Sequence, residues 1–85
     1  MPNWKLTLRF TPWFRDEDMP IEEKGKSAAS ALRIFAKNKA VELIEDDLLL
    51  LAENFETVTD VEEFDDFMEE LYDMADLERI WVVTF

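Results

Sequence analysis

The sequence contains no cysteine and no histidine, and it has one glycine, Gly25, and three prolines. Without cysteine there is no disulfide framework and no thiolate for nucleophilic or metal chemistry. Without histidine the most common general base is missing, and no imidazole can activate a serine. The low glycine and proline content argues against a disordered chain. We therefore expect a folded protein that is not an enzyme and uses no cofactor.

Two short motifs were considered for ligand binding. Gly25-Lys26-Ser27 resembles the end of a phosphate-binding loop, but that motif requires another glycine five residues earlier, where this chain has Pro20. The acidic clusters at 16–18 and 65–66 lack the alternating ligands and the central glycine of a calcium loop. Neighbouring acids on a helix also point to different sides. The sequence therefore predicts neither nucleotide binding nor a metal site.

A long hydrophobic run is also missing. The longest apolar stretch, residues 48–52, is far shorter than the roughly 20 residues that span a bilayer. The first residues lack the pattern of a signal peptide, so we expect a cytoplasmic protein with no membrane contact. Eighty-five residues suffice for one domain, and 48% hydrophobic and 13% aromatic residues supply a core. The sequence predicts a single acidic globular domain over residues 1–85.

Alternating side chains predict a strand near each end of the chain. Between residues 4 and 10, large apolar side chains alternate with polar ones, as in a half-buried strand. Residues 79–85 are rich in β-branched and aromatic types, which favour strands. An isolated strand leaves its backbone groups unpaired. We therefore expect these two strands to pair with each other.

The first helix is expected after the irregular stretch that follows the first strand. Pro20 suits the first turn of a helix, with Asp18 or Met19 near the cap. Gly25 weakens these first turns, so the firm part of the helix is predicted at 27–37.

The last helix carries the clearest signals. Thr59 with Glu62 matches a capping box, and Asp60 offers a second cap. An apolar stripe then follows at helical spacing: Val61, Phe64, Phe67 or Met68, Leu71 and Ala75.

The middle segment decides the fold. In residues 41–55, apolar positions recur at intervals of three and four, which favours a largely buried helix. The alternative is a hairpin broken at 45–47, but no glycine supplies its turn. The helix gives a small α+β fold, β-α-α-α-β, with the terminal strands paired and the helices packed on one face. The hairpin gives a ferredoxin-like β-α-β-β-α-β order.

Charge is the most unusual property of this chain. Residues 40–78 contain sixteen Asp and Glu and no Lys or Arg, within a net charge of −12. Ordinary solvated helices alternate Lys with Glu, because opposite charges one turn apart stabilise a helix and like charges repel. The absence of such pairs predicts that the acids form a binding surface for a cationic partner. The predicted residues on the last helix are Glu62, Glu63, Asp65, Asp66, Glu69, Glu70 and Asp73. Those on the preceding segment are Glu42, Glu45, Asp46 and Asp47.

In size, charge and lack of catalytic residues, the chain resembles the small acidic DNA-mimic proteins with which phages and mobile elements inhibit host nucleases, including anti-restriction and anti-CRISPR inhibitors. This resemblance implies a decoy that blocks a basic nucleic-acid-binding protein. We also expect that the chain does not itself bind nucleic acid, because like charges would have to be desolvated together. Carboxylates on successive helical turns lie about 5–6 Å apart, a spacing that can imitate a row of phosphates.

Two other surfaces were predicted. Trp13, Phe14 and Arg15 follow the first strand and are of the types that dominate interface hot spots, although they also suit the edge of a core. The alternative function is a structural adaptor or homodimer with an apolar interface, in which the acids only confer solubility. Its candidate contacts are Leu49, Leu50, Trp81 and Phe85.

Overall fold

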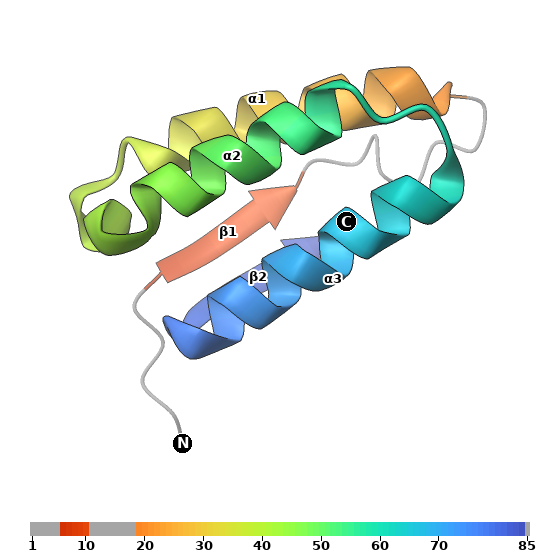
Figure 1. The fold of residues 1–85 in the computed structure, drawn as a ribbon. Helices are drawn as coiled ribbons and strands as arrows, with labels where there is room; N and C mark the ends of the chain where they lie inside the picture. Colours follow the sequence, from red (N-terminus) through yellow and green to blue (C-terminus); the bar gives the residue numbers. More distant parts are fainter. Residues whose placement is uncertain (1–5, 11–18, 85) are drawn as a thin grey trace.

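The computed structural model describes residues 6–10 and 19–84, and the structural statements below concern these residues. The chain order is β1 (Leu6–Phe10), α1 (Ile21–Ala36), the short 3-10 helix η2 (Lys39–Ile44), α2 (Glu45–Glu56), α3 (Val61–Leu77) and β2 (Ile80–Thr84). Helices α1 and α2 lie side by side, and α3 packs against β2 (Figure 1). A small α+β fold with paired strands is thereby confirmed. The ferredoxin-like alternative is wrong, because residues 40–55 form helices rather than a hairpin.

The two strands pair in parallel, and their register separates a buried face from an exposed one. Leu6 lies opposite Ile80, and Leu8 lies opposite Val82. Leu8 and Ile80 are buried in the core, whereas Trp81, which points to the other face, is 51% exposed. Parallel neighbours cannot be joined by a tight turn. The three helices between the strands therefore form the crossover connection.

Helix α1 begins slightly later than the predicted cap at Asp18 or Met19, and it is regular from its first turn. Its first residue is Ile21, and Pro20 is the N-cap rather than the first helical residue. The Pro20 carbonyl accepts hydrogen bonds from the backbone N–H groups of Glu23 and Lys24 at 3.0 and 3.1 Å. The expectation that the firm part starts at residue 27 is wrong, because the first turns pack against the rest of the molecule.

Gly25 permits this packing. It is buried within α1, and its backbone does not adopt a positive φ angle. A Cβ atom at this position would overlap the backbone carbonyl oxygen of Phe55 and the Cγ1 atom of Val58. The glycine is therefore required by the close approach of α1 to the end of α2, not by an unusual backbone conformation.

Residues 39–56 form two helical pieces rather than one. The Asn38 side chain accepts a hydrogen bond from the Ala40 N–H at 2.9 Å and starts η2. Val41 departs from helical angles (φ −115°, ψ 20°), and a regular helix begins only at Glu45. Acids in the first turn of α2 favour a start here, because they interact well with the helix dipole. The predicted apolar stripe is buried as expected: Val41, Ile44, Leu48, Leu51 and Phe55.

Of the two caps predicted for α3, Asp60 is confirmed and the capping box of Thr59 with Glu62 is wrong. Asp60 is the N-cap, and its carboxylate accepts a hydrogen bond from the Glu63 N–H at 2.8 Å. Thr59 donates its hydroxyl hydrogen bond to the Glu63 carboxylate at 3.0 Å, so Glu62 takes no part. Val61 is 60% exposed and does not belong to the core, contrary to expectation. The buried stripe consists of Phe64, Met68, Leu71 and Ala75.

The core is centred on Phe55, which is fully buried. Its ring makes edge-to-face contacts with Phe64 and Phe67, with centroid distances of 5.3 and 5.7 Å. Such contacts stabilise beyond simple burial and hold the end of α2 against the start of α3.

In the described part of the chain, no helix combines the length and the apolar character needed to cross a membrane.

Candidate functional site

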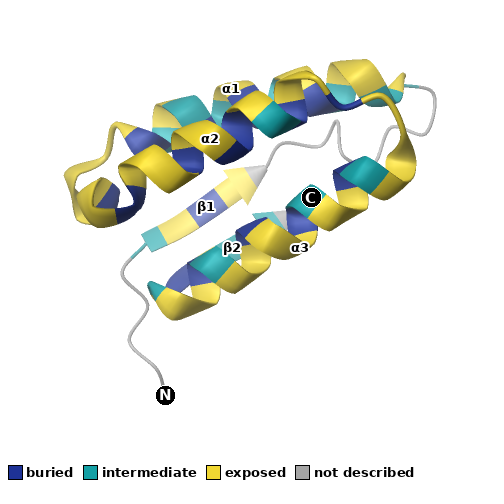
Figure 2. Cartoon of the chain, viewed as in Figure 1, coloured by how far each residue is buried: buried dark blue, intermediate teal, exposed yellow. Residues whose placement is uncertain are grey.

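The outer side of α3 carries a row of exposed carboxylates. Because α3 buries one stripe of its surface, every residue about half a turn away from that stripe points to solvent. Figure 2 shows this exposed side of α3 in yellow. We call the exposed acids of this helix the α3 acidic face: Glu62, Asp65, Asp66, Glu69, Glu70, Asp73 and Asp76.

The α3 acidic face is long and regular. From Glu62 to Asp76 it extends about 21 Å along the helix axis, which equals the axial rise of about six nucleotides of one DNA strand. Neighbouring acids one turn apart have Cβ atoms about 5–6 Å apart. Two unit charges at about 6 Å repel by roughly 0.7 kcal/mol in water before salt screening. None of these acids forms an ion pair with another described residue.

The structure changes the membership of the predicted set at two positions. Glu63 is only partly exposed, and its carboxylate is used at the start of α3 as the acceptor for Thr59. Asp76 is exposed and continues the row one turn beyond Asp73, but the sequence analysis did not include it. Its position three residues after Asp73 places Asp76 on the same side of a helix, and this spacing could have identified it from the sequence.

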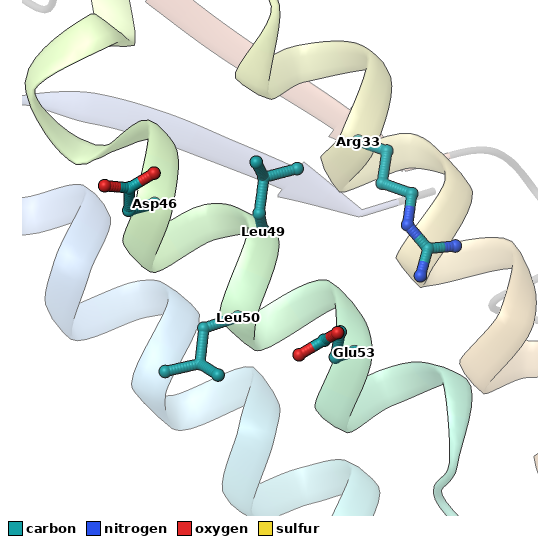
Figure 3. A pocket seen from close by; sticks show the side chains of 5 residues that line it. All are labelled: Arg33, Asp46, Leu49, Leu50 and Glu53. Carbon is teal, nitrogen blue, oxygen red and sulfur yellow. The ribbon is translucent and has the colours of Figure 1, made fainter.

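The predicted acids of α2 and η2 are exposed but do not all join α3. Asp46 lies with Arg33, Leu49 and Glu53 around a shallow pocket between α1 and α2 (Figure 3). Asp47 lies on the side of α2 that borders α3, where it lines a groove together with Glu70 and Asp73. The structure thus brings Asp47 to the α3 acidic face. Glu42 and Glu45 are exposed at the start of this segment.

Basic residues of α1 balance part of the charge on α2. Arg33 forms an ion pair with Glu56, the last residue of α2. The hydrogen bond from Arg33, the charge of Arg33 and, to a smaller extent, the charge of Lys26 lower the pKa of Glu56. Because α1 packs beside α2, these cations lie on the α2 side of the molecule. After Lys39, the sequence contains one basic residue, Arg79, which follows α3.

A groove separates α2 from α3. It has a volume of about 420 Å³. Its α2 wall is lined by Asp47, Leu50, Leu51 and Asn54, and its α3 wall by Glu70, Asp73, Met74 and Leu77. Leu50 and Leu77 are 58% and 84% exposed. We call this feature the α2–α3 groove. Sequence analysis did not predict it, although it identified Leu50 as an exposed apolar residue.

The remaining candidate residues give no further site. Trp13, Phe14 and Arg15 lie outside the described residues, as does Phe85. Within the described part, no three acidic side chains converge in an arrangement that could hold a metal ion.

Comparison of the chain with protein-family models, with curated proteins and with solved structures finds no match. The chemistry of the described side chains is therefore the basis for a functional proposal.

Proposed function

We propose that this protein is a non-catalytic acidic decoy, which occupies the nucleic-acid-binding site of a basic protein through the α3 acidic face. The observation that carries the proposal is a row of seven exposed carboxylates on one helix, without an ion pair to another described residue. A cationic groove that binds phosphates in a row offers such a helix the same charge interactions. Complementary charge also accelerates association with this class of partner.

The position of the acids on α3 supports a binding role over simple solubility. Acids near the start of a helix are stabilised by the helix dipole, whereas acids near its end are not. Helix α3 has no basic residue in its last turn and carries Asp76 there. Lysine at alternate positions would keep the surface soluble and would add favourable pairs one turn apart. Beyond its first turn, α3 therefore lacks both the favourable dipole interaction and the favourable charge pairs, as expected of a surface that interacts with cations of a partner.

A decoy of this kind does not bind nucleic acid itself. Contact between the α3 acidic face and phosphates would bring like charges together, in a molecule whose net charge is −12. We therefore expect no mobility shift of duplex DNA or RNA at physiological salt. Tight binding in this assay would contradict the proposal.

The test compares two variants with equal changes in net charge. In the first, Glu62, Asp66 and Glu69 are changed to Lys; these acids belong to the α3 acidic face and do not line the α2–α3 groove. The control changes Glu22, Glu23 and Glu53, which are exposed on α1 and α2 and belong to no predicted binding surface, to Lys. Each variant and the original chain are immobilised and exposed to a lysate, with and without competing duplex DNA.

We expect the original chain to retain basic proteins that duplex DNA displaces. A retained protein is then purified, and displacement of its labelled duplex is followed by fluorescence anisotropy at increasing salt. The α3 variant should lose at least about tenfold in potency, since several charge pairs are reversed, and the control should lose much less. Equal losses in both variants, or retention that neither DNA nor the α3 changes affect, would contradict the proposed site.

A second candidate function is favoured by exposed apolar side chains. Leu49, Leu50 and Trp81 are 37%, 58% and 51% exposed, and they suit an adaptor or a homodimer with an apolar interface. These residues lie on α2 and β2 rather than on one element. Sedimentation velocity distinguishes this function, because apolar self-association strengthens with added salt whereas binding through carboxylates weakens.

A further inference from the structure

The α2–α3 groove combines an apolar floor with acidic walls. Leu51 is buried at its base, Met74 is partly buried, and Leu50 and Leu77 expose most of their side chains along its edges. Single exposed leucines are common on protein surfaces, but here two of them border the same groove. Methionine adapts its shape to different partners, which suits a binding surface.

The charge of the groove walls restricts what can occupy it. Asp47 stands on the α2 wall, Glu70 and Asp73 stand on the α3 wall, and no described Lys or Arg lines the groove. An occupant must therefore present apolar side chains to the floor and cations to both walls. An amphipathic helix with Lys or Arg on either side of its apolar stripe has this arrangement, and helices commonly dock into grooves in this way.

A second copy of this chain fits the groove poorly. Its net charge is also −12, and residues 40–78 of that copy contain acids without Lys or Arg. Docking its α2 or α3 would place carboxylates against Asp47, Glu70 and Asp73. Its α1 does carry Lys and Arg, but the apolar stripe of that helix is already buried in the core of its own chain. The groove is therefore better matched by a different, cationic chain.

We infer that the α2–α3 groove receives a cationic amphipathic helix of the basic partner, whose apolar stripe contacts Leu50, Leu51, Met74 and Leu77 while its cations face Asp47, Glu70 and Asp73. This inference rests on the proposed function, since it names the part of the partner that binds beside the α3 acidic face. It adds an apolar contact, which gives the site a preference for shape as well as for charge.

The experiment uses a labelled synthetic peptide of about 15–18 residues, long enough to form a helix, with a leucine stripe flanked by lysines. A scrambled peptide of identical composition lacks the stripe, and a third peptide carries Glu in place of Lys. Binding to the full chain is measured by fluorescence anisotropy at physiological salt. The variants are Leu77→Gln, the double variant Leu50→Gln with Leu77→Gln, and Leu43→Gln. Leu43 is 89% exposed and lies outside the groove, so it is the matched control.

We expect the striped peptide to bind at least about tenfold more tightly than the scrambled one, and the double variant to remove most of this difference. Leu43→Gln should change the affinity less than about twofold. Leu77→Gln alone decides the outcome if the double variant is poorly folded, because the Leu77 side chain is almost fully exposed. Chemical shifts in α2 and α3 should move on binding of the striped peptide.

Equal binding of the striped and scrambled peptides, unaffected by Leu77→Gln, overturns the groove inference while leaving the α3 acidic face untouched. The variant with Glu62, Asp66 and Glu69 changed to Lys is tested in parallel against the retained basic protein. If this variant loses affinity for that protein, the proposed function is still supported. Binding of the Glu-containing peptide, or no binding of any peptide, also overturns the inference. A dimer in sedimentation that Leu77→Gln dissociates would identify a second copy as the occupant instead.

Discussion

Replacement of Gly25 by alanine tests how closely α1 and α2 approach. In an isolated helix this change is favourable by about 1 kcal/mol, because alanine restricts the unfolded backbone and glycine does not. In this protein the new Cβ would overlap the carbonyl oxygen of Phe55 and the Cγ1 of Val58, and it would lie 3.3 Å from the Phe55 carbonyl carbon. Two of these three atoms belong to the backbone. They cannot move away by rotation of a side chain.

The clash has to be relieved by a shift of α1 away from α2. That shift would loosen a tightly packed interface, because Ala28, Ala29 and Leu32 of α1 are fully buried. Overpacking in such interfaces costs about 1–3 kcal/mol or more. We place the clash at the upper end, about 3 kcal/mol, because the backbone is involved, so after subtraction of the helix preference the net loss is about 2 kcal/mol. For a protein of this size, that loss corresponds to a melting temperature about 8–16 °C lower.

The measurement is thermal and urea unfolding, followed by circular dichroism at 222 nm. Ser30→Ala is the control for helix preference, because Ser30 is exposed on the same helix. It should raise stability slightly, by about 0.5 kcal/mol. A double-mutant cycle with Val58→Ala should show a favourable coupling, since this change removes one of the overlapping atoms. A Gly25→Ala variant that melts at or above the temperature of the original protein would refute the close approach.

Three further predictions concern the charged groups. Glu56→Gln should destabilise the protein at pH 7. Because Arg33 lowers the pKa of Glu56, the ion pair stabilises the folded state at every pH above the ordinary pKa of 4.5. The difference in unfolding free energy between the two proteins should shrink as the pH falls below 4.5 and through the lowered pKa. Urea unfolding between pH 7 and pH 3 checks this, and a difference that grows toward low pH would contradict it. Asp60→Ala should cost about 1 kcal/mol through loss of the N-cap of α3, measured by urea unfolding, whereas an unchanged midpoint would show that the cap is dispensable. At pH 7, added sodium chloride should raise the melting temperature, because it screens the repulsion within the α3 acidic face more than the attraction between Arg33 and Glu56. A decrease would show that the acids are stabilised by cations.

Local pattern was sufficient to identify most elements of the fold. The alternation around Leu8 identified the buried face of β1, because successive strand residues point to opposite sides. The intervals of three and four between Val41 and Phe55 identified the buried side of η2 and α2. The same periodicity placed the acids of α3 opposite its core stripe. These features depend only on neighbours in the sequence, and for that reason they were predictable.

Features that depend on distant parts of the chain were not predictable in the same way. The alternating pattern of a short strand is compatible with either direction, so the parallel pairing of Leu6 with Ile80 was not indicated. Gly25 was interpreted as a weak point of α1, because helix preference alone says nothing about what packs against it. The α2–α3 groove requires the relative placement of Leu50 and Leu77, which are 27 positions apart in the chain.

Packing and charge are divided between different helices, and this division has a physical reason. Helix α1 brings small buried residues, Gly25, Ala28 and Ala29, against α2, so that much of the core is built where cations of α1 offset part of the charge on α2. Helix α3 packs against the core through one apolar stripe, which includes Phe64 and its contact with Phe55. The rest of its surface does not contribute to the core. Acids on this free surface repel one another by amounts that exposed sites tolerate. Charge reversal on the α3 acidic face should therefore alter binding strongly and folding little, which makes the two effects separable in one variant.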